Sequence, residues 1–409
     1  MSTTKHREEG SRRRLPFLLS ALLPICSASA CGQGSKSSES SAQARAGQDA
    51  AAGGEAAPAD LGPPACGQVA YVASEGGSQH IELVPASGGE ARVMPAVMAG
   101  EGWRDFPAEV SPDGRSLLVL SAFALPEGKS SDRFALVELD SAADPKLVGP
   151  EGASLRNPSW SPDGRWLAYE SDASSFRDIY RLELASGATL RLTNDPQGNF
   201  EPAISPEGGR IAFVSSRDGN AEIYVMSADG GDPRRLTRSK GDDSEPAWSP
   251  DGARLAFLSA RDRARGIDVF VMGAEGEDPK PLLANAREGG IIASDLAWSP
   301  DGTRLAFAEL ASKGKGGAVV IVDVEHGTEI VRTSTGKVDE QPVWSSDGHH
   351  VAFSSGHQDH VRIMRMTVEG GAVEALTAEG LHWLPRWIAD SHCPHAAPLR
   401  APRAVSDQG

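Results

Sequence analysis

Six polar residues occupy or adjoin one position of a repeated sequence pattern, and their side chains are of kinds that bind cations. Five of them lie four residues before a serine that begins a Ser-Pro-Asp-Gly turn or a close variant of it. They are Asn157, Glu201, Glu245, Asp295 and Gln341, and Glu340 stands beside the last. Carboxylate and amide oxygens bind Ca²⁺, and carboxylates also attract basic peptides. We therefore expect a site for calcium or for a basic segment. The alternative is that these side chains only solvate a water-filled space and cap strand ends.

The turn that follows these residues explains why the pattern repeats. In the stretch EPAWSPDGARLAFLSA (245–260), Pro250 presets its φ, Asp251 can bond to nearby backbone, and Gly252 accepts a positive φ. The apolar run at 255–258 is too short for a helix, so we expect two strands joined by a hairpin turn. The repeated turn aspartates and tryptophans are therefore interpreted as structural rather than as ligands. They are Asp163, Asp251, Asp301 and Asp347, and Trp160, Trp248, Trp298 and Trp344.

The turn recurs with a period in the forties. Its serines are separated by 50, 44, 44, 50 and 46 residues, and they are Ser111, Ser161, Ser205, Ser249, Ser299 and Ser345. Most copies continue with an aliphatic-Ala-aromatic strand, a third strand, a Gly-rich turn and a short edge strand. Four strands in a unit of this length are typical of a β-propeller. In that fold the six polar residues would lie where a loop enters each innermost strand, around one mouth of the central channel.

The two ends of the repeat array complete each other. Residues 69–71 have the pattern of a second strand without a first, and residues 384–387 have the pattern of a first strand without a second. Together they would form one composite blade, which removes exposed strand edges. We expect an all-β fold of seven four-stranded blades; the alternative is six blades with the first hairpin outside the ring. Cys66 and Cys393 flank the half-blades, so we expect a disulfide between them in an oxidising compartment.

The repeat resembles that of the TolB-type β-propeller family. The resemblance rests on the W-S-P-D-G turn, the aliphatic-Ala-Phe strand and the strand EIYVM at 222–226, and it covers residues 67–388. It implies the propeller fold, and it implies that partners dock at the channel mouth and its loops. The same repeat occurs in periplasmic scaffolds, peptidase gating domains and polysaccharide lyases, so it does not define a function. TolB itself has an α/β domain before its propeller, whereas about 35 low-complexity residues precede the first strand here.

The N-terminus has the pattern of an export signal. Basic residues precede an apolar stretch at 15–25, and an A-S-A cleavage site at 28–30 precedes Cys31. Cys31 in this position resembles the acylated cysteine of a bacterial lipoprotein; simple secretion is the alternative. We expect an exported lipoprotein of a diderm bacterium, periplasmic or anchored to the outer membrane. The expected organisation is a signal peptide at 1–30, a low-complexity tether at 31–65, a propeller at 66–393 and a disordered tail at 394–409.

Without the signal peptide the chain would be strongly acidic. After removal of residues 1–30, 35 Lys and Arg face 54 Asp and Glu, which gives a formal net charge of −19. Because nucleic acid binding requires a basic surface, this composition argues against nucleic acid as a partner. It favours cations or basic partner surfaces. We expect a monomer that binds an envelope protein or glycan and reaches the membrane only through its lipid anchor.

Sequence patterns for catalysis are sparse. The chain has no G-x-S-x-G elbow, and about 20 residues follow the last expected strand, so we expect no hydrolase domain and no cofactor other than the calcium considered above. Histidines gather late in the chain but match no zinc signature, and we interpret them as solvated surface, with a metal site as the alternative. They are His349, His350, His357, His360, His382, His392 and His395. A non-catalytic binding protein is therefore expected; the alternative is a polysaccharide lyase or hydrolase that acts in the channel.

Overall fold

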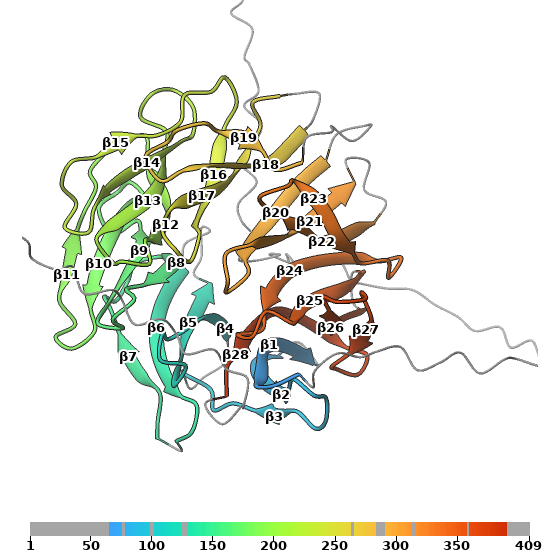
Figure 1. Cartoon of the computed structure of the whole chain (residues 1–409). Coiled ribbons are helices and arrows are strands. Elements are labelled where there is room, and N and C mark those ends of the chain that lie inside the picture. The colour runs from blue at the N-terminus through green and yellow to red at the C-terminus, as the bar shows by residue number, and fades with distance from the viewer. Residues whose placement is uncertain are drawn as a thin grey trace, which may run out of the picture. The chain divides into compact units, whose positions relative to one another are not determined.

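The computed structural model describes residues 65–75, 78–98, 102–124, 130–141, 143–262, 266–283, 291–311, 316–357 and 360–390. The expected signal peptide, nearly all of the tether and the expected tail lie outside the described residues. Within the described ranges, regular secondary structure consists of 28 β-strands, with no helix (Figure 1). No helix long and apolar enough to span a membrane is therefore found in this part of the chain. The predicted all-β fold is confirmed.

The described strands form units of four, and within each unit neighbouring strands are antiparallel. Units I to III follow one another along the chain. Unit I contains β4 (Trp103–Val110), β5 (Ser116–Ala124), β6 (Ser130–Glu138) and β7 (Lys146–Val148). Unit II contains β8 (Leu155–Trp160), β9 (Trp166–Ser171), β10 (Asp178–Glu183) and β11 (Thr189–Arg191). Unit III contains β12 (Asn199–Ile204), β13 (Arg210–Ser215), β14 (Glu222–Ser227) and β15 (Arg234–Arg235).

Units IV to VI repeat this arrangement. Unit IV contains β16 (Asp243–Trp248), β17 (Arg254–Ser259), β18 (Gly266–Gly273) and β19 (Lys280–Pro281). Unit V contains β20 (Ile291–Trp298), β21 (Arg304–Ala311), β22 (Gly317–Asp323) and β23 (Thr328–Arg332). Unit VI contains β24 (Val338–Trp344), β25 (His350–His357), β26 (His360–Thr367) and β27 (Val373–Ala375). A short parallel pairing of β18 with β20 joins unit IV to unit V.

A further unit, called the closing unit here, combines the two ends of the described chain. β28 (Leu381–Ile388) pairs antiparallel with β1 (Gln68–Glu75), which pairs with β2 (Ser78–Pro85), which pairs with β3 (Arg92–Val93). The first strands of the units contact one another in the order β4, β8, β12, β16, β20, β24, β28 and back to β4. The expected composite of two half-blades is therefore present. A total of seven blades stays a prediction, which this pairing supports.

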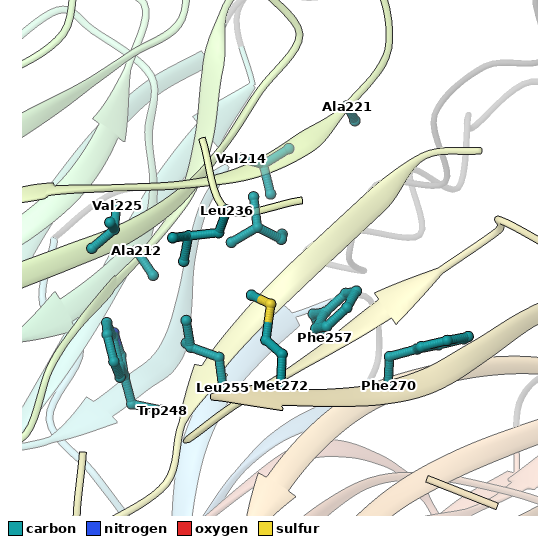
Figure 2. Close-up of a cluster of buried hydrophobic side chains, with 11 residues drawn as sticks. Ala212, Val214, Ala221, Val225, Leu236, Trp248, Leu255, Phe257, Phe270 and Met272 are labelled. Atoms are coloured by element: carbon teal, nitrogen blue, oxygen red, sulfur yellow. The ribbon is translucent and has the colours of Figure 1, made fainter. Parts of the chain in front are cut away.

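The hydrophobic core lies between neighbouring units, because each middle strand buries both of its faces. In β13, Ala212 and Val214 pack toward unit IV with Leu255, as Figure 2 shows. Phe213, which alternates with them, packs toward unit II with Trp166. Full burial of a Phe or Leu side chain contributes roughly 1.5–3 kcal/mol. The short apolar runs of the repeat are thus strands covered on both faces, as their length predicts.

The repeated turns are held by their own side chains. The Ser249 hydroxyl donates to Asp251 Oδ1 at 2.6 Å, and the same Asp251 oxygen accepts the Ala253 N–H at 3.0 Å. These hydrogen bonds lower the pKa of Asp251, with the Ser249 bond as the main cause. Gly252 has a φ of 69°, which its missing Cβ permits. The Ser–Asp bond recurs in the pairs Ser111–Asp113, Ser161–Asp163, Ser299–Asp301 and Ser345–Asp347.

The repeated tryptophans connect successive units. The indole N–H of Trp248 donates to the Ala203 carbonyl of unit III at 3.0 Å, and Trp298 and Trp344 make the equivalent bonds to Ala247 and Ala297. The Arg210 guanidinium lies over the Trp248 ring, 4.6 Å from its centroid. Trp248, Trp298, Trp344 and the turn aspartates therefore have the structural contacts expected of them, whereas the indole N–H of Trp160 is buried without a hydrogen-bond partner.

Candidate functional site

The polar positions singled out in the sequence lie at a β-bulge in the first strand of their units. In β12 the pairing with β13 shifts register between Phe200 and Ala203, and Glu201 has a φ of 53°. A bulge adds residues to one strand and redirects their side chains. Positive φ is uncommon outside glycine, so its recurrence marks one shared backbone geometry. The residues with this geometry, called the bulge residues below, are Asn157 (φ 45°), Glu201 (53°), Glu245 (51°), Asp295 (57°), Gln341 (59°) and Leu384 (55°).

The bulge residues of neighbouring units are linked by hydrogen bonds. Glu201 Oε2 accepts the backbone N–H of Glu245 at 2.7 Å, and Glu245 Oε2 accepts that of Asp295 at 3.1 Å. Asp295 accepts the N–H of Gln341, and Gln341 Oε1 accepts that of Leu384 at 2.9 Å. Each side chain therefore binds the backbone of the next unit in the ring. The structure links Glu201, Glu245, Asp295 and Gln341 in sequence order, each to the next unit; their place at a channel mouth stays a prediction.

Asn157 takes part in a different way. Its amide donates to Glu170 Oε1 at 2.5 Å, and Glu170 Oε1 also accepts the Glu201 N–H at 2.6 Å. Glu170 comes from the second strand of unit II and is 1% exposed. Burial raises the pKa of this carboxyl group. In unit II the link to the next unit therefore passes through a buried glutamate that the repeat pattern did not single out.

The carboxylates of this region disfavour one another electrostatically. Burial raises the pKa of Glu245 well above its usual value, and the charges of Glu201 and Asp295 raise it further. Burial also raises the pKa of Asp295 and of Glu340, to which Asp295 adds repulsion. All four side chains are nevertheless partly exposed. The inner strands therefore bring together several partly exposed carboxyl groups, and burial and mutual repulsion make some of them release their protons less readily than usual.

Two charged residues that sequence reasoning missed belong to the same region. Burial raises the pKa of Glu109 in β4 to about 7, and the nearby Arg386 guanidinium in β28 partly opposes that shift. Arg386 also donates from Nε to the Ala108 carbonyl at 2.6 Å. The signal was present in the sequence, because Pro385-Arg386-Trp387 departs from the Pro-Ala-Trp of unit IV, where the middle residue is Ala247.

The fit of this region to calcium is poor. Among the described residues, no group of three or more His, Cys, Asp or Glu side chains is arranged to hold a metal ion. One oxygen of Glu201 and one of Glu245 is already directed at a backbone N–H of the next unit. These two oxygens are therefore engaged with backbone N–H groups rather than directed at a common ion.

The late histidines are dispersed in the described part of the chain. His350 is buried and stacks on Trp387 with centroids 6.2 Å apart, whereas His349 faces Glu369. His382 contacts Tyr71 edge to face at 5.2 Å. His392 and His395 lie outside the described residues. His349, His350 and His382 therefore have separate partners, whereas His357 and His360 are exposed and pair with each other across β25 and β26.

Of the predicted cysteine sites, only Cys66 is described. Its carbonyl accepts the indole N–H of Trp387 at 3.1 Å, which places Cys66 beside the end of β28. Cys31 and Cys393 lie outside the described residues, so lipidation and the Cys66–Cys393 disulfide stay predictions.

Fold and inner-strand geometry together define a β-propeller whose repeats carry a bulge at a shared position. Residues 127–288 match the family model described as TolB beta propeller domain. The match is consistent with a TolB-type propeller, in agreement with the resemblance of the repeat.

Three proteins illustrate how far the similarity extends. An uncharacterized protein of Agrobacterium fabrum strain C58 is 29% identical over 130 residues, which is 31% of this chain and 40% of that protein. The chain thus matches about two fifths of that relative's length. TolB from Acinetobacter baumannii is 20% identical with a TM-score of 0.48, covering 78% of this chain and 82% of its own. An oligogalacturonate lyase in complex with manganese is 12% identical with a TM-score of 0.54, covering 76% of this chain and 85% of its own. At that identity, the likeness to the lyase concerns the fold alone.

Proposed function

We propose that this protein is a non-catalytic binding protein of the cell envelope. Its partner is an envelope protein that inserts a basic segment among the inner-strand carboxylates of Glu201, Glu245 and Asp295. Of the partner classes expected from sequence, a basic protein segment matches this chemistry better than a neutral glycan, because the region carries several acidic groups.

One observation carries the proposal: the fold does not require negative charge at the bulge. Gln341 occupies the same bulge geometry as Glu245 and accepts the next unit's N–H with an uncharged amide oxygen. An acceptor is therefore sufficient for the link between units. The charge of Glu245 is not needed for the link, and it is unfavourable because burial and the charges of Glu201 and Asp295 raise the pKa of Glu245. A function that uses the charge accounts for this cost.

The electrostatic gain from a cation is of the right size for binding. Two unit charges 4 Å apart interact by about 4 kcal/mol at the effective dielectric constant of a protein surface, near 20. A lysine or arginine side chain among three carboxylates would relieve their mutual repulsion as well as form new hydrogen bonds. Arg386 lies near Asp295 and Glu109, and its charge partly opposes the burial that raises the pKa of both carboxyl groups. Burial lowers the pKa of Arg386, and the charges of Glu109 and Asp295 partly oppose that shift.

The proposed location is the periplasmic side of a membrane, with the chain held by an acyl group on Cys31. The cleavage site and the cysteine after it support this proposal. Replacing Cys31 with alanine should move the protein from the membrane fraction to the soluble fraction. A variant that stays with the membrane, together with a wild type that takes up no labelled fatty acid, would exclude the anchor.

The proposed disulfide between Cys66 and Cys393 would join the two ends of the closing unit. It is supported by the pairing of Gln68 with Ile388, because this pairing brings the chain entering β1 beside the chain leaving β28. Non-reducing peptide mapping of the exported protein should yield one peptide pair containing both cysteines. Free thiols at both positions would remove this proposal.

Crosslinking in cells tests the function. The wild type and the triple variant Glu201→Gln, Glu245→Gln, Asp295→Asn are expressed at equal levels, treated with a reversible amine-reactive crosslinker and purified. The amides keep the acceptors of the ring, so the variant should fold while losing its captured partner. A surface variant, Glu90→Gln with Asp140→Asn and Asp144→Asn, removes the same number of charges from exposed positions and should capture the partner as the wild type does.

Two outcomes would count against the proposal. Equal capture by the wild type and the triple amide variant would show that the inner carboxylates do not bind the partner. Release of unsaturated sugars from pectic oligosaccharides by the purified protein with manganese would show that the protein is a lyase instead.

A further inference from the structure

Three buried polar atoms without a hydrogen-bond partner lie in one row across unit I. They are Asp105 Oδ1, Ser121 Oγ and Arg133 Nε. Asp105 pairs with Ser121 across β4 and β5, and Ser121 pairs with Arg133 across β5 and β6. Residues directly opposite one another in antiparallel strands share a face of the sheet. The three atoms are therefore neighbours on one face, and Asp105 and Ser121 are 7% and 0% exposed.

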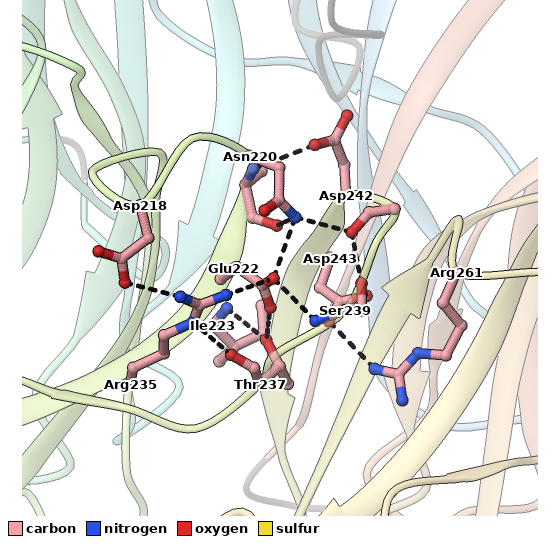
Figure 3. Close-up of polar contacts among 12 residues, drawn as sticks. Asp218, Asn220, Glu222, Ile223, Arg235, Thr237, Ser239, Asp242, Asp243 and Arg261 are labelled. Carbon is pink, nitrogen blue, oxygen red and sulfur yellow. Dashed lines mark hydrogen bonds and ion pairs between the residues drawn. The ribbon is translucent and has the colours of Figure 1, made fainter.

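In unit IV the polar atoms of the aspartate and serine at the equivalent positions all have hydrogen-bond partners, and an arginine side chain binds both residues. Asp243 pairs with Ser259, the Ser259 hydroxyl donates to Asp243 Oδ1 at 2.5 Å, and both residues bind Arg261. Arg261 donates from Nε to Ser259 Oγ at 2.7 Å and from Nη2 to Asp243 Oδ2 at 3.0 Å. Figure 3 shows Arg261 and Asp243 of this row.

Unit III repeats this arrangement. Arg217 donates from Nε to Ser215 Oγ at 2.9 Å and from Nη2 to Asn199 Oδ1 at 3.0 Å. Asn199 and Ser215 pair in the same register as their counterparts in units I and IV. In both units the arginine stands two residues after the serine. In units III and IV a guanidinium therefore binds both the serine and the acidic or amide side chain of the row, whereas in unit VI Thr335 contacts Asp339 and Ser355 of the equivalent row.

Unit I lacks that arginine. Two residues after Ser121 stands Phe123, whose ring packs against Trp103 with centroids 5.3 Å apart. The unpartnered atoms of Ser121 and Asp105 are a serine hydroxyl and an aspartate carboxylate oxygen, the same two groups to which Arg261 donates in unit IV. Because a buried polar atom without a hydrogen-bond partner destabilises the folded state, a row with three such atoms should bind a partner.

The atoms cannot readily serve one another, because both charged side chains are held elsewhere. Asp105 Oδ2 accepts the Val97 N–H at 2.8 Å, and Arg133 forms an ion pair with Glu151 at 2.7 Å. Asp105 Oδ1 needs a donor, whereas Arg133 Nε needs an acceptor. A cation would satisfy only the aspartate and an anion only the arginine. A small molecule that can both donate and accept hydrogen bonds can bind Asp105 Oδ1 and Arg133 Nε, and the Ser121 hydroxyl as well.

We propose that unit I holds a buried water molecule that bridges Asp105, Ser121 and Arg133 in the place that an arginine fills in units III and IV. Buried waters typically make about three hydrogen bonds to otherwise unpaired polar groups, which is the number available here. Val97 lies between β3 and β4, so the bridged aspartate also fixes the connection from the closing unit to unit I. This inference does not depend on the proposed function.

A crystal structure of the exported protein at about 1.5 Å resolution tests the proposal. The expected result is a water peak within roughly 2.7–3.2 Å of Asp105 Oδ1, Ser121 Oγ and Arg133 Nε. The rows of Ser215 and Ser259 in the same crystal are internal controls, and each should show its arginine in this place instead. A direct Asp105–Arg133 bond, or an empty row in well-defined density, would overturn the proposal.

A variant gives a second test in the same crystal form. Phe123→Arg restores the pattern of units III and IV, so its guanidinium should bind Ser121 and Asp105 and displace the water. A water that remains in place beside a guanidinium directed elsewhere would contradict the proposed equivalence of the three rows.

Discussion

In units I to VI each first strand contains a bulge and is followed by the repeated turn, and the two regions differ in how far the fold restricts their residue types. At the turn, units I, II and IV to VI use the same Ser–Asp hydrogen bond, so the side chains themselves define the geometry. At the bulge the backbone geometry repeats while the side chains vary among Asn, Glu, Asp, Gln and Leu. The fold therefore fixes residue identity at the turn but only a backbone shape at the bulge. Because the side chain at the bulge can vary without changing the backbone geometry, it can be one that binds a partner.

The largest predicted effect is at the turn end of the strand. Trp248→Ala removes a side chain that packs between units III and IV, and should lower the free energy of unfolding by about 3–5 kcal/mol. Trp248→Phe keeps most of the packing but loses the bond to Ala203, and should cost about 1 kcal/mol. Urea unfolding followed by circular dichroism measures both. Equal losses for the two variants would show that the indole bond, rather than packing, dominates.

A smaller effect on stability is predicted for substitutions of Glu245 at the bulge. Comparing two variants distinguishes the role of its hydrogen-bond acceptor from the role of its charge. Glu245→Ala leaves the Asp295 N–H without its acceptor and should lower the free energy of unfolding by about 1–3 kcal/mol. Glu245→Gln keeps an acceptor, as Gln341 does, and should be at least as stable as the wild type at pH 8. Both are compared by urea unfolding with Asp140→Asn, an exposed control. If the alanine and glutamine variants lose equal stability, the charge itself is structural and the comparison fails.

The smallest effect is a pH dependence of the bulge charges. Glu245 and Asp295 have raised pKa values in the folded protein, so the folded state binds their protons more tightly than the unfolded state does. Their contribution to stability is fully present below the unfolded pKa values, near 4, and is lost as pH rises through the folded ones. Relative to Glu245→Gln with Asp295→Asn, the wild type should therefore lose about 1 kcal/mol between pH 5 and pH 8.

This comparison between proteins removes other titrating groups. His350 and His382 have pKa values lowered by burial, so they destabilise the protein on acidification, in the opposite direction. Both proteins carry these histidines, and their contribution cancels in the difference. A difference that is constant from pH 5 to pH 8 would show that the bulge carboxylates do not interact as proposed.

Local rules were sufficient to predict the turn, the buried strands and the complementary half-blades. Pro250, Asp251 and Gly252 act within a few residues, and alternation fixes which side chains of β13 face each neighbour. The bulge was not predictable in this way, because the positive φ of Glu201 depends on a register shift against β13 that only pairing reveals. The polar position was found from spacing, but its bond to the next unit's backbone required the three-dimensional order of the strands.

Three residues with special contacts, Glu109, Arg386 and Phe123, differ in the sequence from the residues at the equivalent positions of several other units, and this was the only sign of them. Glu109 and Arg386 stand where units III, IV and V have alanine, yet their interaction depends on the contact between β4 and β28 at the ring closure. Phe123 in place of arginine became meaningful once the register of Asp105 with Ser121 was known. Long-range pairing, rather than local propensity, decides each of these features.

Calorimetric titration with a short lysine-rich peptide tests the central claim most directly. The wild type should bind the peptide, and the variant Glu201→Gln, Glu245→Gln, Asp295→Asn should bind it at least about tenfold more weakly, a loss of 1.4 kcal/mol or more. The surface variant Glu90→Gln, Asp140→Asn, Asp144→Asn should bind as the wild type does, and added salt should weaken binding because it screens the attraction between the peptide and the partly exposed carboxylates. Equal affinity of the wild type and the triple amide variant, with both folded by circular dichroism, would contradict the claim that the bulge carboxylates form the binding site.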